Sequence, residues 1–204
     1  MTIGHTIEGM FETDRLRLRG TSVLDGASIL RLYNDPLVTP WITVGFRTAR
    51  HESETGELIK QTENALMGCI IEEKETGAFV GLTGFMPLRA GETRNRTVTV
   101  YIGLMPEFWG KGYAYEAMAY VVGYAFWDMG MHRVGLSVFE GNERAVALYR
   151  KLGFVEEGRD RKAIWMQGGW RDLIRMGIIE DEWREWIKKN PVPQSSPWST
   201  IASS

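Results

Sequence analysis

The chain has 204 residues, of which 44% are hydrophobic and 25% charged, and its formal net charge is −2. This length accounts for a single domain around one hydrophobic core, and the composition is too apolar for a disordered chain. The near-neutral charge excludes a global positive field, so we expect neither a nucleic-acid nor a membrane partner.

Cysteine and histidine are too scarce for a disulfide framework or a metal site. Cys69 is the only cysteine, and the three histidines have no paired ligand spacing. The longest apolar run, residues 117–127, is shorter than the ~20 residues of a membrane span. Residues 1–14 lack the pattern of a secretory signal. We therefore expect a cytoplasmic protein without a bound metal.

Hydrophobic periodicity predicts alternating strands and helices in the first half of the chain. Residues 15–19 alternate between arginine and leucine, which is typical of a half-buried strand. Helical patterns follow over 24–33 and 49–66, separated by an apolar, non-periodic segment over 34–48. Two further strands are predicted over 69–74 and 78–88, joined by a turn at Gly77.

The second half continues in the same manner. A strand over 97–104 leads to a helix over 113–129 that is apolar nearly all round, so we expect it to be buried against a sheet. The remaining pattern predicts a strand over 132–139, a helix over 142–152, a strand pair within 155–179 and a helix over 180–189. Residues 1–189 are thus expected to form one domain, and residues 190–204 a flexible tail rich in Pro and Ser.

The join between the strand over 97–104 and the following helix contains the first functional motif, Met-Pro-Glu-Phe-Trp-Gly-Lys-Gly over residues 105–112. Glycines at a helix N-terminus expose backbone N–H groups beside the positive end of the helix dipole, which favours an anion such as phosphate. A P-loop needs Ser or Thr where Gly112 stands, and a dinucleotide fingerprint needs glycine where Tyr115 stands, so both are excluded. The alternative is that Gly110 and Gly112 only shape a turn.

The second motif spans residues 142–154 and follows the strand over 132–139. Asn142 is a good N-cap residue, and Tyr149 lies two helical turns further on, so both share one face with Ala145 or Val146. One stripe of this helix can therefore line one ligand. The alternative is that Asn142 is only a cap and Tyr149 only a core aromatic.

Three segments, taken in order, resemble the GNAT superfamily of acetyl-CoA-dependent N-acetyltransferases, and within it the RimJ/RimL-like branch. They are residues 12–19 (Glu-Thr-Asp-Arg-Leu-Arg-Leu-Arg), 105–117 and 142–154, and the resemblance covers roughly residues 12–179. It implies an α/β (α+β) fold with a mixed, mostly antiparallel sheet of about seven strands, helices on both faces and a splay between the two central strands. One departure is Trp109, because the family usually has Gln or Arg at this first loop position. The substitution removes a side-chain donor and leaves the backbone N–H groups.

The resemblance also implies how acetyl-CoA binds. Its pantetheine arm would pair with the strand backbone at Ile102, Gly103 and Leu104, in the gap between the splayed strands. Its pyrophosphate would lie on the loop formed by Trp109, Gly110, Lys111, Gly112, Tyr113 and Ala114, with Asn142 and Tyr149 lining the site from the next helix. Further cationic contacts to the phosphates are expected from Lys111, Arg144, Arg150 and Lys151.

The implied reaction is attack of a neutral amine on the thioester carbonyl. It needs an N–H donor for the developing oxyanion, which the resemblance places near Ile102, and an acid for the departing thiolate. Tyr149 suits the acid, because a phenol with a pKa of ~10 is protonated at neutral pH. Many members carry a glutamate base on the strand that here spans 97–104, but this strand has no acidic residue. We expect Glu140 as the substitute base, and a water relay is the alternative.

By the same resemblance, acceptor specificity lies in residues 36–46 and 159–172, which contain Trp41, Trp165 and Trp170. An aromatic wall favours a small or flat amine, and an α-amine with a pKa near ~8 needs less base strength than lysine. The expected acceptor is a small-molecule amine or the N-terminus of a peptide or protein, and the enzyme a monomer or homodimer. Two alternatives stay open: an acyl-CoA-binding sensor without turnover, and a partner-binding domain in which both motifs only serve packing.

Overall fold

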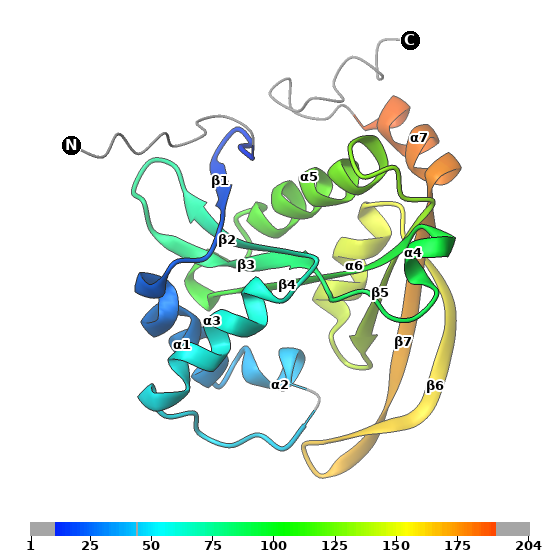
Figure 1. Cartoon of the computed structure of the whole chain (residues 1–204). Coiled ribbons are helices and arrows are strands. Elements are labelled where there is room, and N and C mark those ends of the chain that lie inside the picture. Colours follow the sequence, from blue (N-terminus) through cyan, green and yellow to red (C-terminus); the bar gives the residue numbers. More distant parts are fainter. Residues whose placement is uncertain (1–10, 44, 191–204) are drawn as a thin grey trace, which may run out of the picture.

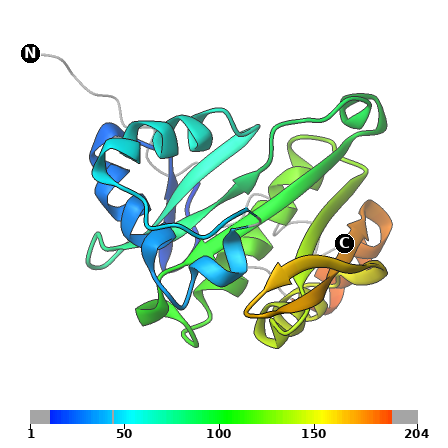
Figure 2. The same ribbon diagram turned by 90° about the horizontal axis from the view of Figure 1, so that it is seen from below.

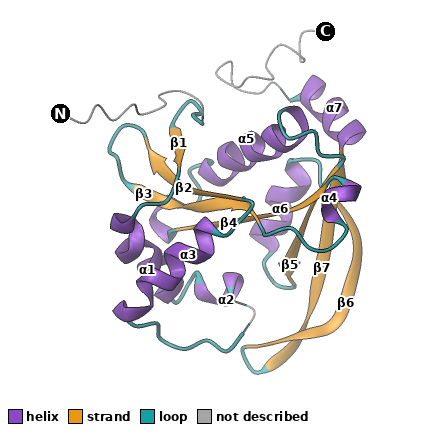
Figure 3. Cartoon of the chain, in the orientation of Figure 1, coloured by secondary structure: helices purple, strands orange, loops and turns teal. Residues whose placement is uncertain are grey.

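Seven strands form one mixed sheet in the order β1-β2-β3-β4-β5-β7-β6 in the computed structural model, which describes residues 11–43 and 45–190 (Figures 1 and 3). All neighbouring strands are antiparallel except β4 and β5, which run parallel. The predicted α/β fold with a mostly antiparallel sheet is therefore confirmed. The strands are β1 (Leu16–Arg19), β2 (Met67–Glu73), β3 (Phe79–Phe85), β4 (Thr97–Leu104), β5 (Arg133–Phe139), β6 (Val155–Met166) and β7 (Gly169–Ile179).

Helices cover both faces of this sheet. Helices α1 (Gly26–Asn34), α2 (Thr39–Ile42) and α3 (Thr55–Glu63) lie on one face, and α5 (Tyr113–Trp127) crosses the other (Figures 1 and 2). The other helical segments are α4 (Glu92–Asn95), α6 (Glu143–Lys151) and α7 (Glu180–Lys189), with the short 3-10 turns η1 (Val23–Asp25), η2 (Glu52–Glu54) and η3 (Pro106–Phe108).

Helix α5 is the buried helix that the sequence predicts, although it ends two residues earlier, at Trp127. It contacts β1, β3, β4 and β5, and residues such as Ala117, Met118 and Val121 have no exposed surface. Away from the sheet, the ring of Tyr124 contacts Phe11 and that of Phe126 stacks on Trp183, so the apolar circumference is explained by packing on more than one side. Within the described part of the chain, no helix combines the length and the apolar character that crossing a membrane requires.

Two predictions for the region between β1 and β2 are wrong in detail. The helix predicted over 49–66 is limited to η2 and α3, because Glu54 accepts the N–H of His51 at 2.8 Å and so turns the chain just before the helix. The non-periodic segment over 34–48 contains the short helix α2, with Pro40 in its first turn, where its missing N–H costs nothing. The predicted tail lies outside the described residues from residue 191 onward.

The central strands β4 and β5 separate after a short parallel contact. Their pairing extends only from Thr97↔Arg133 to Thr99↔Gly135. Beyond it, β4 stays paired with β3 as far as Leu104, and β5 stays paired with β7 as far as Phe139. The sheet therefore opens between the carboxyl ends of β4 and β5, as the resemblance implied.

Candidate functional site

The open edge of β4 presents unpaired backbone groups. The carbonyl of Thr99 accepts the N–H of Met86, just after β3, at 2.8 Å, and that of Tyr101 accepts the hydroxyl of Thr83 at 2.8 Å. The N–H of Met105 donates to the carbonyl of Val80 at 2.9 Å. Because backbone groups alternate sides along a strand, the C=O of Val100 and both the N–H and C=O of Ile102 face the gap, whereas the N–H of Val100 belongs to the last parallel pairing, that of Thr99 with Gly135. Gly103 pairs with Leu82 of β3 and faces away from the gap. Val100 was not predicted as a site residue, although the alternation of the strand could have indicated it.

The loop after β4 forms a cradle of backbone N–H groups. Gly110 and Gly112 have φ angles of +76° and +82°, a region that favours glycine. The N–H groups of residues 110–115 have no acceptor among the described residues, and the last of these residues form the first turn of α5. Unpaired N–H groups at a helix N-terminus suit an anion with several oxygens, such as a pyrophosphate.

Trp109 links this loop to its surroundings. Its indole N–H donates to the carbonyl oxygen of Leu104 at 2.9 Å, so that carbonyl is occupied, and only the N–H of Leu104 remains for the gap. The guanidinium carbon of Arg144 lies 4.5 Å from the centre of the Trp109 ring. Trp109, which stands where the family usually has Gln or Arg, thus contacts other residues of the protein through both its N–H and its ring.

Helix α6 lies against the cradle at both of its ends. Near its start Arg144 covers Trp109, and near its end the Nζ of Lys151 lies 4.6 Å from the centre of the Tyr115 ring. Asn142 caps the helix, since its side-chain oxygen accepts the N–H of Ala145 at 3.2 Å. Val146 and Tyr149 are buried on the same helix, so the predicted shared face exists.

Tyr149 keeps its proton at neutral pH. Burial raises the pKa of its phenol to about 12, because the phenolate would lose its hydration. Within the described part of the chain, its hydroxyl has no hydrogen-bond partner, and its ring contacts Phe154 at a centroid distance of 6.0 Å. The group therefore has a proton available for donation.

The predicted cationic residues differ in their availability. Arg150 pairs with Glu156 at 3.6 Å, which draws it toward β6. Lys111 lies with its Nζ 5.0 Å from the centre of the Phe108 ring. For Lys111, Arg144 and Lys151, no carboxylate among the described residues forms an ion pair. These three side chains are thus free to meet phosphate charge.

Glu140 has a partner in the protein. Its Oε2 accepts the backbone N–H of Asp172 at 3.0 Å, and its own N–H donates to the carbonyl of Asp172. These two bonds attach the end of β5 to β7. One oxygen of the carboxylate therefore stabilises the fold. The other, Oε1, has no hydrogen bond among the described residues.

The three tryptophans expected to line the acceptor site are not brought together. Trp41 packs beside Phe139, Ile164 and Met166 at the end of β5. Trp165 lies between Ile164 and Met166 in β6 and so points to the opposite face, where it contacts Trp170 at 5.4 Å. Trp165 and Trp170 are 61% and 57% exposed. Of the three, only Trp41 shares the face of the apolar cluster.

More than half of the sequence matches a known family model. The model of an acetyltransferase (GNAT) domain matches residues 15–155. The chain belongs to this GNAT acetyltransferase family. The match confirms the resemblance to the RimJ/RimL-like branch, and it makes the chain an acetyltransferase of a family that uses acetyl-CoA.

Relatives of this GNAT chain cover most of its length. An uncharacterized N-acetyltransferase of Bacillus subtilis (strain 168), YoaA, is 29% identical over 175 residues, which is 84% of this chain and 97% of YoaA. The spermidine N(1)-acetyltransferase of Vibrio cholerae is 29% identical over 121 residues, 59% of this chain and 68% of that enzyme. The crystal structure of a spermidine N-acetyltransferase from Vibrio cholerae, with CoA and spermine, has a TM-score of 0.74 at 25% identity. It covers 84% of this chain and 99% of that one.

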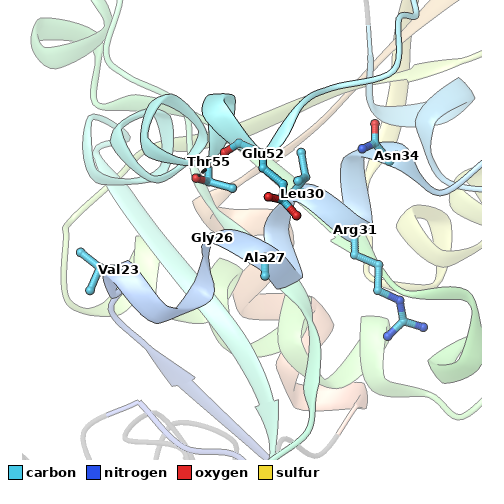
Figure 4. A pocket seen from close by; sticks show the side chains of 8 residues that line it. All are labelled: Val23, Gly26, Ala27, Leu30, Arg31, Asn34, Glu52 and Thr55. Atoms are coloured by element: carbon cyan, nitrogen blue, oxygen red, sulfur yellow. Dashed lines mark hydrogen bonds between the residues drawn. The ribbon is translucent and has the colours of Figure 1, made fainter.

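A surface pocket of about 520 Å³ lies outside this site (Figure 4). It is formed by η1, α1, η2 and the start of α3, and its polar side chains include Arg31, Asn34 and Glu52. No residue of β4, β5, α5 or α6 lines it. The pocket is therefore separate from the gap and the cradle.

Proposed function

We propose that this acetyltransferase moves the acetyl group of acetyl-CoA to a primary amine by direct attack in a ternary complex. The observation that carries the proposal is the row of N–H groups over residues 110–115, which have no acceptor in residues 11–43 and 45–190 and lie next to the open edge of β4. These are the groups that a long thioester with a pyrophosphate can pair with. Gly110, Lys111 and Gly112 are exposed, so this row is open to a ligand from solvent.

Each part of acetyl-CoA has matching groups in this chain. The pyrophosphate fits the cradle, with Lys111, Arg144 and Lys151 as nearby cations. The amide groups of the pantetheine arm fit the C=O of Val100 and the N–H and C=O of Ile102, which lie beyond the last pairing with β5. The thioester then lies in the gap, within the part of the site that α6 and Tyr149 border.

In the proposed reaction, a neutral amine attacks the thioester carbonyl, forming a C–N bond. The N–H of Ile102 stabilises the oxyanion, because a fixed donor costs no reorganisation as the charge develops. The C–S bond breaks, and the phenol of Tyr149 protonates the departing thiolate. The proton that the amine loses goes to the free oxygen of Glu140, which releases it to solvent, and Tyr149 regains its proton from solvent.

The expected acceptor is a monoamine or an N-terminal α-amine. Trp41 and its cluster form an apolar wall that disfavours the extra ammonium groups of a polyamine. At the end of β5, Glu140 and Asp172 each already accept a backbone N–H with one carboxylate oxygen, which leaves few acceptors for further ammonium groups. Spermidine, the substrate named for the Vibrio cholerae relative, is the second candidate.

The test is CoA release over a panel of amines, with mass spectrometry of the products. The panel contains small monoamines, spermidine, peptides with a free N-terminus, and the same peptides with that N-terminus blocked. We expect acetylated product from monoamines or free N-termini and a lower kcat/KM for spermidine. Binding of acetyl-CoA without transfer to any amine would instead indicate a sensor, and absence of binding would contradict the proposal.

A further inference from the structure

Glu116, in the first turn of α5, has a buried carboxylate whose two oxygens are both bonded to the N-terminal segment. Oε1 accepts the hydroxyl of Thr13 at 2.6 Å and the backbone N–H of Arg15 at 2.8 Å. Oε2 contacts Nε and Nη2 of Arg15 at 2.7 and 2.6 Å. Only 9% of Glu116 is exposed. The start of β1 is thus joined directly to the helix that begins at the cradle.

The same arginine also contacts the cradle loop itself. Nη1 of Arg15 donates to the carbonyl oxygen of Lys111 at 3.0 Å. Its guanidinium carbon lies 4.6 Å from the centre of the Tyr113 ring, and a Cβ atom added to Gly112 would lie 3.3 Å from Nη2. The guanidinium therefore lies against the loop backbone.

This contact fixes the direction of one cradle N–H. The C=O of Lys111 and the N–H of Gly112 belong to one trans peptide, so they point in opposite directions. Since the carbonyl points to Arg15, the N–H of Gly112 points away from β1, and it has no acceptor among the described residues. An anion bound on the side of the loop that faces away from β1 would therefore accept a hydrogen bond from this N–H.

Charge supports the same role. The carboxylate of Glu116 lies in the first helical turn, close to the N–H groups that would hold phosphate, and its charge would repel phosphate. Arg15 neutralises it at close range. Without the arginine, the cradle would lose one oriented donor and gain an uncompensated negative charge.

We propose that Arg15 is a positioning residue for acetyl-CoA, which holds the N–H of Gly112 toward the pyrophosphate and neutralises Glu116 beside it. The proposal rests on the proposed function, because it assumes acetyl-CoA on this loop. Arg15 itself does not touch the reacting atoms. Its effect must therefore appear in binding of the pyrophosphate and not in the chemical step.

The test compares Arg15→Gln with Arg17→Gln. Arg17 is the matched control, because it is an arginine of β1 only two residues further on, it pairs with Glu12 and Glu72, and the described residues show no contact between it and the loop. We expect Arg15→Gln to raise the KM and Kd for acetyl-CoA at least about tenfold, with kcat within about twofold of wild type. Arg17→Gln should leave all three constants within about twofold of wild type.

A thioester without pyrophosphate separates positioning from a general structural effect. With S-acetylpantetheine, the kcat/KM of Arg15→Gln should equal that of the wild type, since the cradle is not used. Equal losses with both thioesters, or an unchanged Kd for acetyl-CoA, would overturn the proposal. If Arg15→Gln does not fold, Arg15→Lys takes its place. It keeps the charge beside Glu116, but a single ammonium group cannot supply all these bonds, so the same loss specific to acetyl-CoA is expected.

The proposed function fails separately from this inference. If wild-type protein does not bind acetyl-CoA, the cradle assignment itself is wrong. If wild-type protein binds and transfers acetyl groups while Arg15→Gln does so equally well, only the role of Arg15 is wrong.

Discussion

Trp109 donates its indole N–H to the carbonyl oxygen of Leu104, the last residue of β4. The bond satisfies a carbonyl at the open end of the strand, where β5 no longer pairs with it. The guanidinium of Arg144 in α6 also lies over the face of the Trp109 ring. Trp109 thereby connects the strand, the loop and α6 around the gap, while the backbone N–H groups of the loop stay free.

This arrangement predicts a small effect of removing the indole. Trp109→Ala should change the affinity for acetyl-CoA by less than about tenfold, or ~1.4 kcal/mol, because the cradle N–H groups remain. Isothermal titration measures it, with Trp170→Ala, an exposed tryptophan of β7, as control. A much larger loss in a folded Trp109→Ala protein would show that the indole packs on the ligand.

The cradle should not tolerate a side chain at Gly112. Gly112→Val combines an unfavourable φ of +82° with contact to Arg15, so it should abolish the thermal shift by acetyl-CoA. In the wild type, ligand at ~100 times its Kd stabilises the fold by about 2.7 kcal/mol. Gly130→Val is the matched control, because it has φ +63°, open space around it and a place beyond the far end of α5. If acetyl-CoA shifts the melting temperature of a folded Gly112→Val protein as it does in the wild type, the cradle does not bind the pyrophosphate.

Replacing Glu140 by Gln isolates its charge, since the amide oxygen can still accept the N–H of Asp172. If the carboxylate takes the proton of the amine, kcat/KM should fall by ~10² near neutral pH. The loss should persist above the acceptor's pKa of about 8, because the proposed base takes a proton that the amine loses only on attack, after it is already neutral. A pH profile of both proteins checks this. An unchanged rate at neutral pH would favour the water relay.

Tyr149 also predicts a dependence of stability on alkaline pH. Its pKa is raised in the folded protein from 10.0 to about 12, so the stabilisation is complete below pH 10 and is lost as pH rises from 10 to about 12. Its full value is about 2 to 3 kcal/mol. Denaturant unfolding at about pH 8 and about pH 11 should show a smaller decrease for Tyr149→Phe than for wild type. Equal decreases would mean that this phenol is not desolvated.

Local patterns predicted most of the fold. The β-branched residues of β4 and the amphipathic pattern of α7 gave the observed boundaries, because both signals lie within a short stretch of the chain. The short helix α4 (Glu92–Asn95) was missed, since four residues carry no periodic signal. The reach of α3 was overestimated, because the turn at His51 depends on a single side-chain bond.

The site was less accessible to sequence reasoning. The Glu116 contact with Arg15 joins residues 101 positions apart, which no local pattern reveals. The separation of Trp165 from Trp41 follows from the period of two along β6, in which Ile164 and Met166 take the buried face. The sequence shows this alternation directly. It does not show that Ile164 and Met166 pack against Phe139, which decides that their face of β6 is the buried one.

The exchange Tyr149→Phe tests the central claim most directly, because it removes only the hydroxyl and keeps the buried ring. If the phenol protonates the thiolate, kcat should fall by ~10² or more, while the Kd for acetyl-CoA stays nearly constant. Tyr149→Ala shows what lost packing does to the melting temperature. The account predicts a folded, acetyl-CoA-binding Tyr149→Phe protein with little turnover, and a kcat within about twofold of wild type would contradict it.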